Sequence, residues 1–107
     1  MNTQTTEIKA ITVLAGVESY LANLQEFSNK DFQVNYPNTW AAGRHPIFSF
    51  KRGPKWIKVI RGESVFCFID PTNGDIYKPA GYNTPAKGKR GNIFDEKVPL
   101  QEGQLYS

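Results

Sequence analysis

The sequence contains very few of the residues that usually carry metal or nucleophilic chemistry. Among its 107 residues, Cys67 is the only cysteine and His45 is the only histidine. One cysteine cannot form an internal disulfide or a cysteine-rich zinc site, and one histidine argues against a His-Cys metal cluster or a His-based catalytic triad. We therefore expect no cofactor and no metal, and an enzyme is the least favoured class of function.

Long apolar segments are also missing. No apolar run approaches the roughly 20 residues that span a bilayer, so the sequence excludes an integral membrane protein. Residues 1–7 lack the basic start and the apolar core of a signal peptide, so we expect a cytoplasmic protein without a membrane partner. Hydrophobic residues make up 39% of the chain, which is enough for one modest folded domain over residues 1–107 and too much for wholesale disorder.

Positive charge is concentrated in the middle of the chain. Residues 44–90 contain ten Lys or Arg residues against three Asp or Glu residues, a net charge of +7, whereas residues 1–43 and 91–107 each carry −2. Such a block attracts phosphate backbones or an acidic protein surface. The same charges are typical of a solvated sheet face that keeps a small domain soluble, and charge alone does not decide between these interpretations.

The N-terminal part of the chain has the pattern of an amphipathic helix over residues 7–28. Apolar side chains recur there every three or four positions, at Ile8, Ile11, Leu14, Ala15, Val17, Leu21, Leu24 and Phe27. Gly16 weakens the helix and predicts close packing against a sheet. After the helix, apolar and polar residues alternate over residues 31–36, which favours a short strand.

Residues 47–79 have the pattern of an antiparallel sheet, with short apolar runs separated by turns, and the run over residues 64–69 is apolar on both faces and predicts a central strand. Residues 80–95 contain too much glycine and proline for regular structure and predict a basic loop. Residues 96–107 predict a loosely held tail, anchored by Val98, Leu100 and Leu105. The predicted fold is α+β: an N-terminal amphipathic helix packed on an antiparallel meander of three or four strands.

The first candidate site is the segment from Tyr77 through Arg90, which includes most of the basic loop. Its glycines place backbone amides beside four cations, Lys78, Lys87, Lys89 and Arg90, with Tyr82 between them. Amides and cations together can hold a phosphate, although the GxxxxGK[ST] pattern of a nucleotide-binding P-loop is absent. The alternative is a solvent-exposed loop with incidental charges, and the clustering favours phosphate contact.

A second candidate site is the segment around Trp56. Cations surround its aromatic residues: Lys51, Arg52, Lys55, Lys58 and Arg61 lie around Phe48, Phe50 and Trp56. On a strand, Trp56 and Lys58 share one face, and an exposed aromatic ring beside cations is what a platform for single-stranded nucleic acid needs. A place in the core is favoured for the two phenylalanines, whereas Trp56 stays open between core and platform.

The remaining polar residues have simpler interpretations. Asp70 and Asp75 flank an Asn-Gly turn, where carboxylates are ordinary turn residues, and this is favoured over cation binding or acid–base work. Cys67 lies within an apolar run and is expected to be a buried, inert thiol. His45 precedes a proline and has no partner that the sequence identifies.

Residues 64–94, SVFCFIDPTNGDIYKPAGYNTPAKGKRGNIF, follow the pattern S-V-x-x-F-[IV]-[DN]-x-x-[TN]-G-[DE]-[IV]-x-K-[PA]-A-x-x-x-x-P-A-K-x-x-R-x-[ND]. Through that pattern the segment resembles small uncharacterised proteins of tailed bacteriophages, including phages of cyanobacteria. Those proteins usually have Ser-Trp after the first Ala, where this chain has Gly81-Tyr82. The resemblance implies a phage origin and a location in the host cytoplasm, implies no activity, and points first to Lys78, Lys87 and Arg90.

These features predict a small basic accessory protein that binds nucleic acid through phosphate contacts and aromatic stacking. The candidate binding residues are Trp56, Lys58, Lys78, Tyr82, Lys87, Lys89 and Arg90. One alternative is a protein-interaction module with an acidic partner, such as an inhibitor of a host enzyme or defence system, or a minor structural phage protein. Another is capture of a small phosphorylated ligand by the glycine-rich loop.

Overall fold

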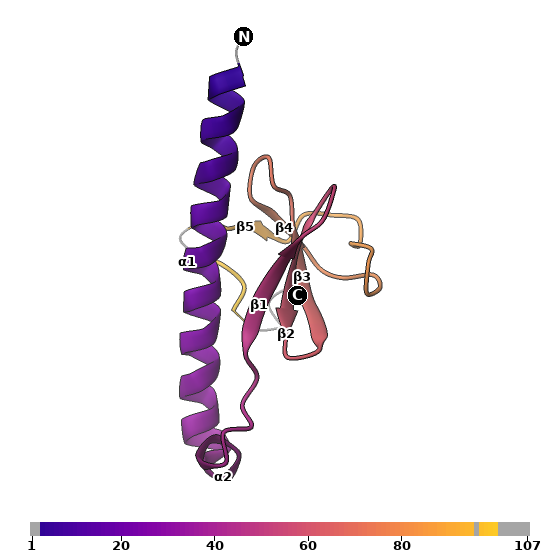
Figure 1. Ribbon diagram of the computed structural model, residues 1–107. Helices are drawn as coiled ribbons and strands as arrows, with labels where there is room; N and C mark the ends of the chain where they lie inside the picture. The colour runs from indigo at the N-terminus through magenta and orange to yellow at the C-terminus, as the bar shows by residue number, and fades with distance from the viewer. Residues whose placement is uncertain (1–2, 96, 101–107) are drawn as a thin grey trace.

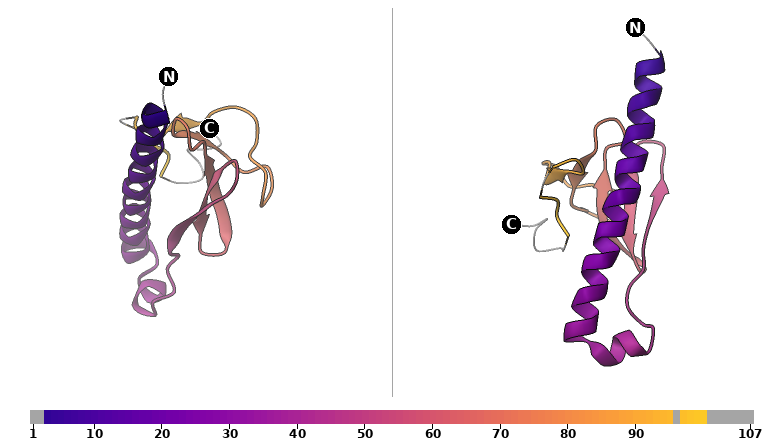
Figure 2. Two further views of the ribbon diagram at one scale, coloured as in Figure 1. Left: turned by 45° about the horizontal axis from the view of Figure 1, so that its top comes forward. Right: turned by 90° about the vertical axis from the view of Figure 1, so that its left-hand side faces the viewer.

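A long helix and a five-stranded sheet make up the fold. The computed structural model describes residues 3–95 and 97–100, with side chains from residue 12 onward. In chain order the elements are α1 (Thr3–Asn35), α2 (Pro37–Ala41), β1 (Phe48–Arg52), β2 (Ile57–Arg61), β3 (Ser64–Ile69), β4 (Asp75–Tyr77) and β5 (Gly91–Asn92). α1 lies along one side of the sheet, and the chain between β4 and β5 loops out on the other side (Figure 1 and Figure 2). The predicted α+β class is confirmed.

α1 extends past both predicted ends, residues 7 and 28, and the strand predicted over residues 31–36 is wrong. The end of the helix is held by contacts four positions apart. Asn35 Nδ2 donates to Asp31 Oδ1 at 2.7 Å, and the Tyr36 amide donates to the Phe32 carbonyl at 2.9 Å. A short alternating segment needs a neighbouring strand to form a ladder, whereas these helical contacts form locally, so the helix continues.

The five strands form one antiparallel sheet in the order β1-β2-β3-β4-β5. This order confirms the predicted meander and the central position of residues 64–69, which are β3. β5 is one strand more than predicted; it lies inside the predicted loop 80–95 and pairs with Asp75 and Ile76 of β4. Two residues are too few to produce a strand pattern in a sequence, so this pairing is visible only in three dimensions.

The main core lies between α1 and the sheet. The helix contributes Val13, Val17, Tyr20 and Leu24, which recur every three or four residues and are at most 3% exposed. On the sheet, the residues that face α1 are cross-strand neighbours, because side chains paired across adjacent strands point to the same face. These pairs are Phe50–Val59, Val59–Cys67, Ile57–Ile69 and Ile69–Ile76. The buried stripe of α1 differs from the predicted one because it includes Val13 and Tyr20.

The other face of the sheet carries a second, smaller cluster. Lys51, Lys58, Phe68 and Tyr77 are opposed in successive strand pairs, so they form a row on the side away from α1. Phe68 is nevertheless only 1% exposed. Trp56 packs edge-on against Phe68 and Tyr77, with ring centroids 6.5 and 5.2 Å apart. β3 is therefore buried on both faces, as its uninterrupted apolar sequence predicts.

The chain after β4 covers this second cluster. Residues 78–86, which we call the cover segment, turn back on themselves through a bridge between Pro79 and Pro85. Within the turn, the Thr84 carbonyl accepts hydrogen bonds from the amides of Ala80 at 2.8 Å and Gly81 at 3.1 Å. Proline has no amide to donate to a strand ladder, so β4 ends before Pro79 and the cover segment folds over the sheet.

Residues 93 and 94 pack between α1 and the β3–β4 turn. A Cβ atom at Gly16 would lie 2.8 Å from side-chain atoms of both Ile93 and Phe94. The close packing predicted for Gly16 is therefore against this segment, not against the sheet. Val98 and Leu100, two of the anchors predicted for the tail, pack against the main core. The third predicted anchor, residue 105, lies outside the described residues.

Cys67 is fully buried beside Tyr20. Burial raises the pKa of the Cys67 thiol, and burial together with the neighbouring thiol raises the pKa of the Tyr20 hydroxyl. The Tyr20 hydroxyl donates a hydrogen bond to the Pro99 carbonyl, which ties the segment after β5 to the helix. A thiol that stays neutral and enclosed is unreactive, so the geometry supports the inert role predicted for Cys67.

Replacing Gly74 by alanine is expected to destabilise the fold more than replacing Gly62. Both glycines have a positive φ, 84° and 63°, where a side chain costs about 1–2 kcal/mol. A Cβ at Gly74 also meets an Ile93 side-chain atom at 2.8 Å, whereas a Cβ at Gly62 has nothing within 4 Å. Overpacking therefore adds about 1–3 kcal/mol for Gly74→Ala only, which urea unfolding curves measure. Equal losses in the two variants would show that residues 93 and 94 are not seated against this turn.

Candidate functional site

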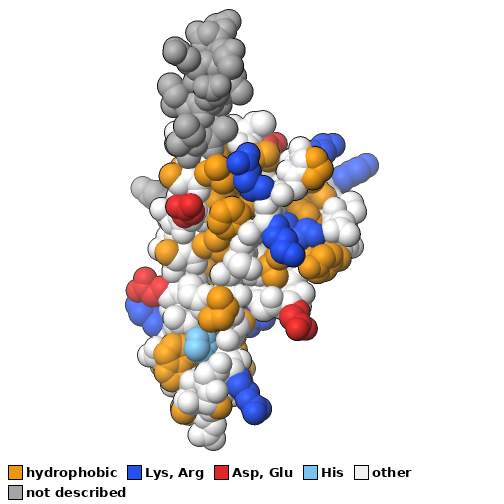
Figure 3. Space-filling view, in the orientation of Figure 1, with side chains coloured by type: hydrophobic (Ala, Val, Ile, Leu, Met, Phe, Trp, Pro, Cys, Tyr) orange, Lys and Arg blue, Asp and Glu red, His pale blue; other side chains and the backbone are white. Residues whose placement is uncertain are grey.

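A groove of about 560 Å³ lies on the second face of the sheet, between the β1–β2 hairpin and the cover segment. It is lined by Lys51, Arg52, Gly53, Pro54, Lys55, Trp56, Lys58, Phe68, Asn83, Thr84 and Pro85. The hairpin turn is closed by the Gly53 amide, which donates to the Trp56 carbonyl at 2.8 Å. Lys and Arg side chains border apolar ones on the right of Figure 3, over the sheet and the chain that follows it. We call this hollow the basic groove.

The floor of the basic groove is aromatic. Trp56 lies half-buried at its base, with Phe68 behind it. The edge-on contacts of Trp56 with Phe68 and Tyr77 fix the plane of the indole against the sheet. The sequence leaves Trp56 open between core and platform, and the structure places it in both environments at once: it packs on the second cluster and lines an open groove.

The rim of the basic groove is cationic. Lys51, Arg52 and Lys55 are exposed, and none of the lining residues is acidic. Over residues 12–95 and 97–100, no carboxylate forms an ion pair with any of these three side chains. Unpaired cations around a recessed apolar floor produce a positive potential that internal carboxylates do not cancel.

Lys58 connects the sheet to the cover segment. Its ammonium group donates to Asn83 Oδ1 at 2.6 Å and lies 4.1 Å from the centroid of the Tyr82 ring. A cation over an aromatic face and a hydrogen bond to an amide each stabilise the closed arrangement. Lys58 and Tyr82, both predicted ligands of nucleic acid, are therefore in contact with each other, and they hold the wall formed by Asn83 in place.

The predicted cluster of Lys87, Lys89 and Arg90 does not line the basic groove. Lys89 Nζ lies 3.6 Å from Asp75 Oδ1, at the β4–β5 edge of the sheet. The Arg90 amide donates to the Ile76 carbonyl at 2.7 Å, and Arg90 Nε is buried without a hydrogen-bond partner among the described residues. Lys87 is exposed on the chain between the cover segment and this edge.

Lys78 begins the cover segment and is half-buried. Its carbonyl accepts a hydrogen bond from the Ala86 amide at 2.8 Å, so its backbone closes the cover segment. Lys78 does not line the basic groove either. Of the seven predicted site residues, the structure places Trp56 and Lys58 in the groove and Tyr82 against Lys58.

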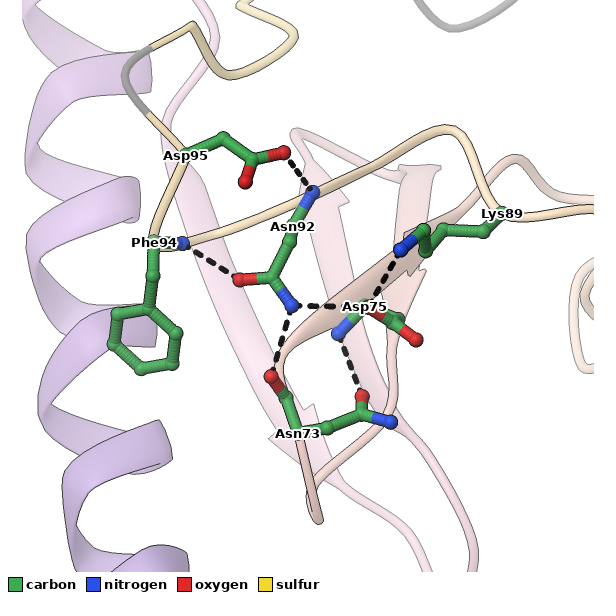
Figure 4. Close-up of polar contacts among 6 residues, drawn as sticks. All are labelled: Asn73, Asp75, Lys89, Asn92, Phe94 and Asp95. Atoms are coloured by element: carbon green, nitrogen blue, oxygen red, sulfur yellow. Dashed lines mark hydrogen bonds and ion pairs between the residues drawn. The ribbon is translucent and has the colours of Figure 1, made fainter.

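Asn92 organises the edge where Lys89 lies (Figure 4). Its Nδ2 atom donates to the Asn73 carbonyl and to Asp75 Oδ1, both at 2.9 Å. Its Oδ1 atom accepts from the Phe94 amide at 2.9 Å. These bonds tie β5 to the β3–β4 turn, so Asp75 and Lys89 belong to a structural network.

Asp70 and His45, the other polar residues singled out in the sequence, make a turn contact and a ring contact, and His45 Nδ1 is buried without a hydrogen-bond partner among the described residues. Asp70 Oδ1 accepts from the Thr72 amide at 2.8 Å and from its hydroxyl at 2.6 Å, as expected of a turn residue. The His45 ring packs on Trp40, with centroids 4.4 Å apart. Among the described residues, no three His, Cys, Asp or Glu side chains are grouped so that they could hold a metal ion.

Several groove residues are absent from the seven candidate binding residues. The sequence places the cations Lys51, Arg52 and Lys55 around Trp56 in the second candidate site, and their spacing around that ring is the signal that could have selected them. Asn83 and Thr84 carry no such signal, because they reach the groove only through the folding of the cover segment over β2 and β3.

Comparison with known proteins identifies a family and no function. A family model described as "Family of unknown function (DUF7717)" matches residues 2–101, which is nearly the whole chain. No curated protein and no solved structure matches. In the part of the chain that the structure describes, no helix is long and apolar enough to cross a membrane.

Replacing Lys58 by methionine is expected to loosen the cover segment. Methionine keeps a long apolar stem but loses the contacts with Asn83 and Tyr82, a loss of about 1 kcal/mol. The amides of Ala80 and Gly81 should then exchange with solvent about five-fold faster, which hydrogen exchange followed by NMR measures. The control is Lys55→Met, which removes a rim cation. Similar exchange in both variants would show that Lys58 does not hold the segment.

Proposed function

We propose that this chain, which belongs to the family of unknown function DUF7717, is a small accessory protein that binds nucleic acid in the basic groove. Lys51, Arg52 and Lys55 hold phosphates at the rim, and Trp56 offers an aromatic surface at the floor. The observation that carries the proposal is the composition of the groove: its lining residues include four cations and no carboxylate, and its floor is aromatic.

The physical chemistry of nucleic-acid binding supports this reading. Phosphate contacts supply most of non-specific affinity, and they require cations that are not already neutralised. Aromatic side chains add sequence-tolerant stacking, which a purely cationic surface lacks. The rim cations satisfy the first requirement and Trp56 the second, and the two lie within one groove of about 560 Å³.

The proposal assigns new roles to the residues predicted from the sequence. Lys58 and Tyr82 position the cover segment, because their side chains are engaged with each other and with Asn83. Lys89 is paired with Asp75 and contributes little to phosphate binding. The chain between β4 and β5 adds positive potential outside the groove through Lys78, Lys87 and Arg90. This potential favours the encounter with a polyanion.

The origin of the chain is part of the proposal. The resemblance of residues 64–94 to small proteins of tailed bacteriophages supports a phage-encoded protein that acts in the host cytoplasm. In that setting, non-specific binding of nucleic acid is an accessory function that needs no catalytic group.

Removing the rim cations is expected to abolish most of the binding. The variant Lys51→Ala/Arg52→Ala/Lys55→Ala should bind a labelled oligonucleotide about ten-fold more weakly, and its salt dependence should be shallower by about two units in log–log slope. Fluorescence anisotropy at two salt concentrations measures both quantities.

A matched control removes the same charge elsewhere. The variant Lys30→Ala/Arg44→Ala/Lys97→Ala also loses three cations, but none of them lines the basic groove. It should bind nearly as tightly as the unmodified chain. Equal losses in the two variants would show that net charge, not the groove, governs binding. If the unmodified chain binds no oligonucleotide at low salt, the proposal fails, and an acidic protein surface is the partner to test.

A further inference from the structure

The recessed floor of the basic groove distinguishes between forms of nucleic acid. Phe68 is 1% exposed and Trp56 is half-buried, so the aromatic surface lies below the exposed rim cations. A duplex presents sugars and phosphates outward and keeps its bases stacked inside. It can therefore reach the rim but cannot place a base on the floor. An unpaired base can do so, because its face is free to leave the strand.

The wall opposite the rim provides a donor for such a base. The Lys58 ammonium group can only donate hydrogen bonds, so the atom that it meets at 2.6 Å must be the Asn83 carbonyl oxygen. This contact fixes the orientation of the Asn83 amide and leaves its NH₂ group for another acceptor. Nucleobase edges carry carbonyl oxygens and ring nitrogens that accept such bonds.

The groove is also formed before any ligand arrives. The Pro79–Pro85 bridge and the hydrogen bonds that the Thr84 carbonyl accepts close the cover segment. Lys58 then fastens this segment to β2. A preformed site loses less conformational entropy on binding than a loop that must be ordered. Most of the contact energy of a single bound base therefore remains in its binding free energy.

From these observations we infer that the basic groove is selective for single-stranded nucleic acid, with one unpaired base seated between Trp56 and the wall formed by Asn83 and Pro85. The flanking phosphates lie on the rim cations. This inference rests on the proposed function, and it goes further because rim cations alone would bind single and double strands alike.

The test uses Trp56 as its own reporter. Trp40 and Trp56 are the two tryptophans, and Trp40 lies in α2, packed on His45. In a Trp40→Phe chain, the fluorescence therefore reports on the groove alone. Three probes of about twelve nucleotides are compared at one salt concentration: a single strand, a duplex, and an abasic strand that keeps the phosphates without bases.

The single strand should bind about ten-fold more tightly than the duplex or the abasic strand, and only the single strand should quench Trp56. Trp56→Leu should bring the single strand to the level of the abasic strand, whereas Trp56→Phe, which keeps a ring, should retain part of the preference. The abasic comparison needs no variant of Trp56, so it holds even if Trp56→Leu fails to fold.

The outcomes distinguish a failure of the single-strand selectivity from a failure of nucleic-acid binding itself. If all three probes bind equally and the Trp56 fluorescence does not change, the selectivity is wrong while nucleic-acid binding stands. If the duplex binds more tightly than the single strand, the seated base is also wrong. If no probe binds, the proposed function itself fails.

Discussion

The burial of β3 on both faces is the constraint on which the rest of the structure depends. Within residues 3–95 and 97–100, α1 is the one long helix, and a helix covers only one face of a sheet. The second face carries Phe68, which would be exposed without another cover. Residues 78–86 provide that cover, and the basic groove is the space that remains between them and the β1–β2 hairpin. The site is thus a consequence of how the sheet excludes water.

The same geometry divides the cations into two groups. Lys58 and Lys89 have intramolecular partners, and each joins the chain after β4 to the sheet. The cations at the end of the β1–β2 hairpin, among them Lys51 and Lys55, project into solvent beside the groove. A cation that already has a partner offers less to a phosphate than one that has none, so the second group is the more suitable for binding a polyanion.

The sequence predicts those parts of the fold whose signals are local. The meander and the central strand follow from turns and apolar runs, and both are confirmed. The strand predicted over residues 31–36 is wrong because helical contacts also form locally and need no partner strand. The site was predictable only in part. Lys58 and Asn83 are 25 residues apart, and their contact depends on the cover segment. Clustering along the chain predicts Lys89 as a phosphate ligand. The fold places Lys89 at the β4–β5 edge of the sheet, outside the basic groove.

The most direct test of the central claim is to map where a single-stranded oligonucleotide binds. In a titration followed by amide chemical shifts, the account predicts the largest changes at residues 51–56, at Lys58, and at Asn83 and Thr84, which line the groove. Residues 87–91 and the exposed face of α1 should change little. Changes confined to residues 87–91 would contradict the account, because the binding site would then be the β4–β5 edge and the basic groove would have another use.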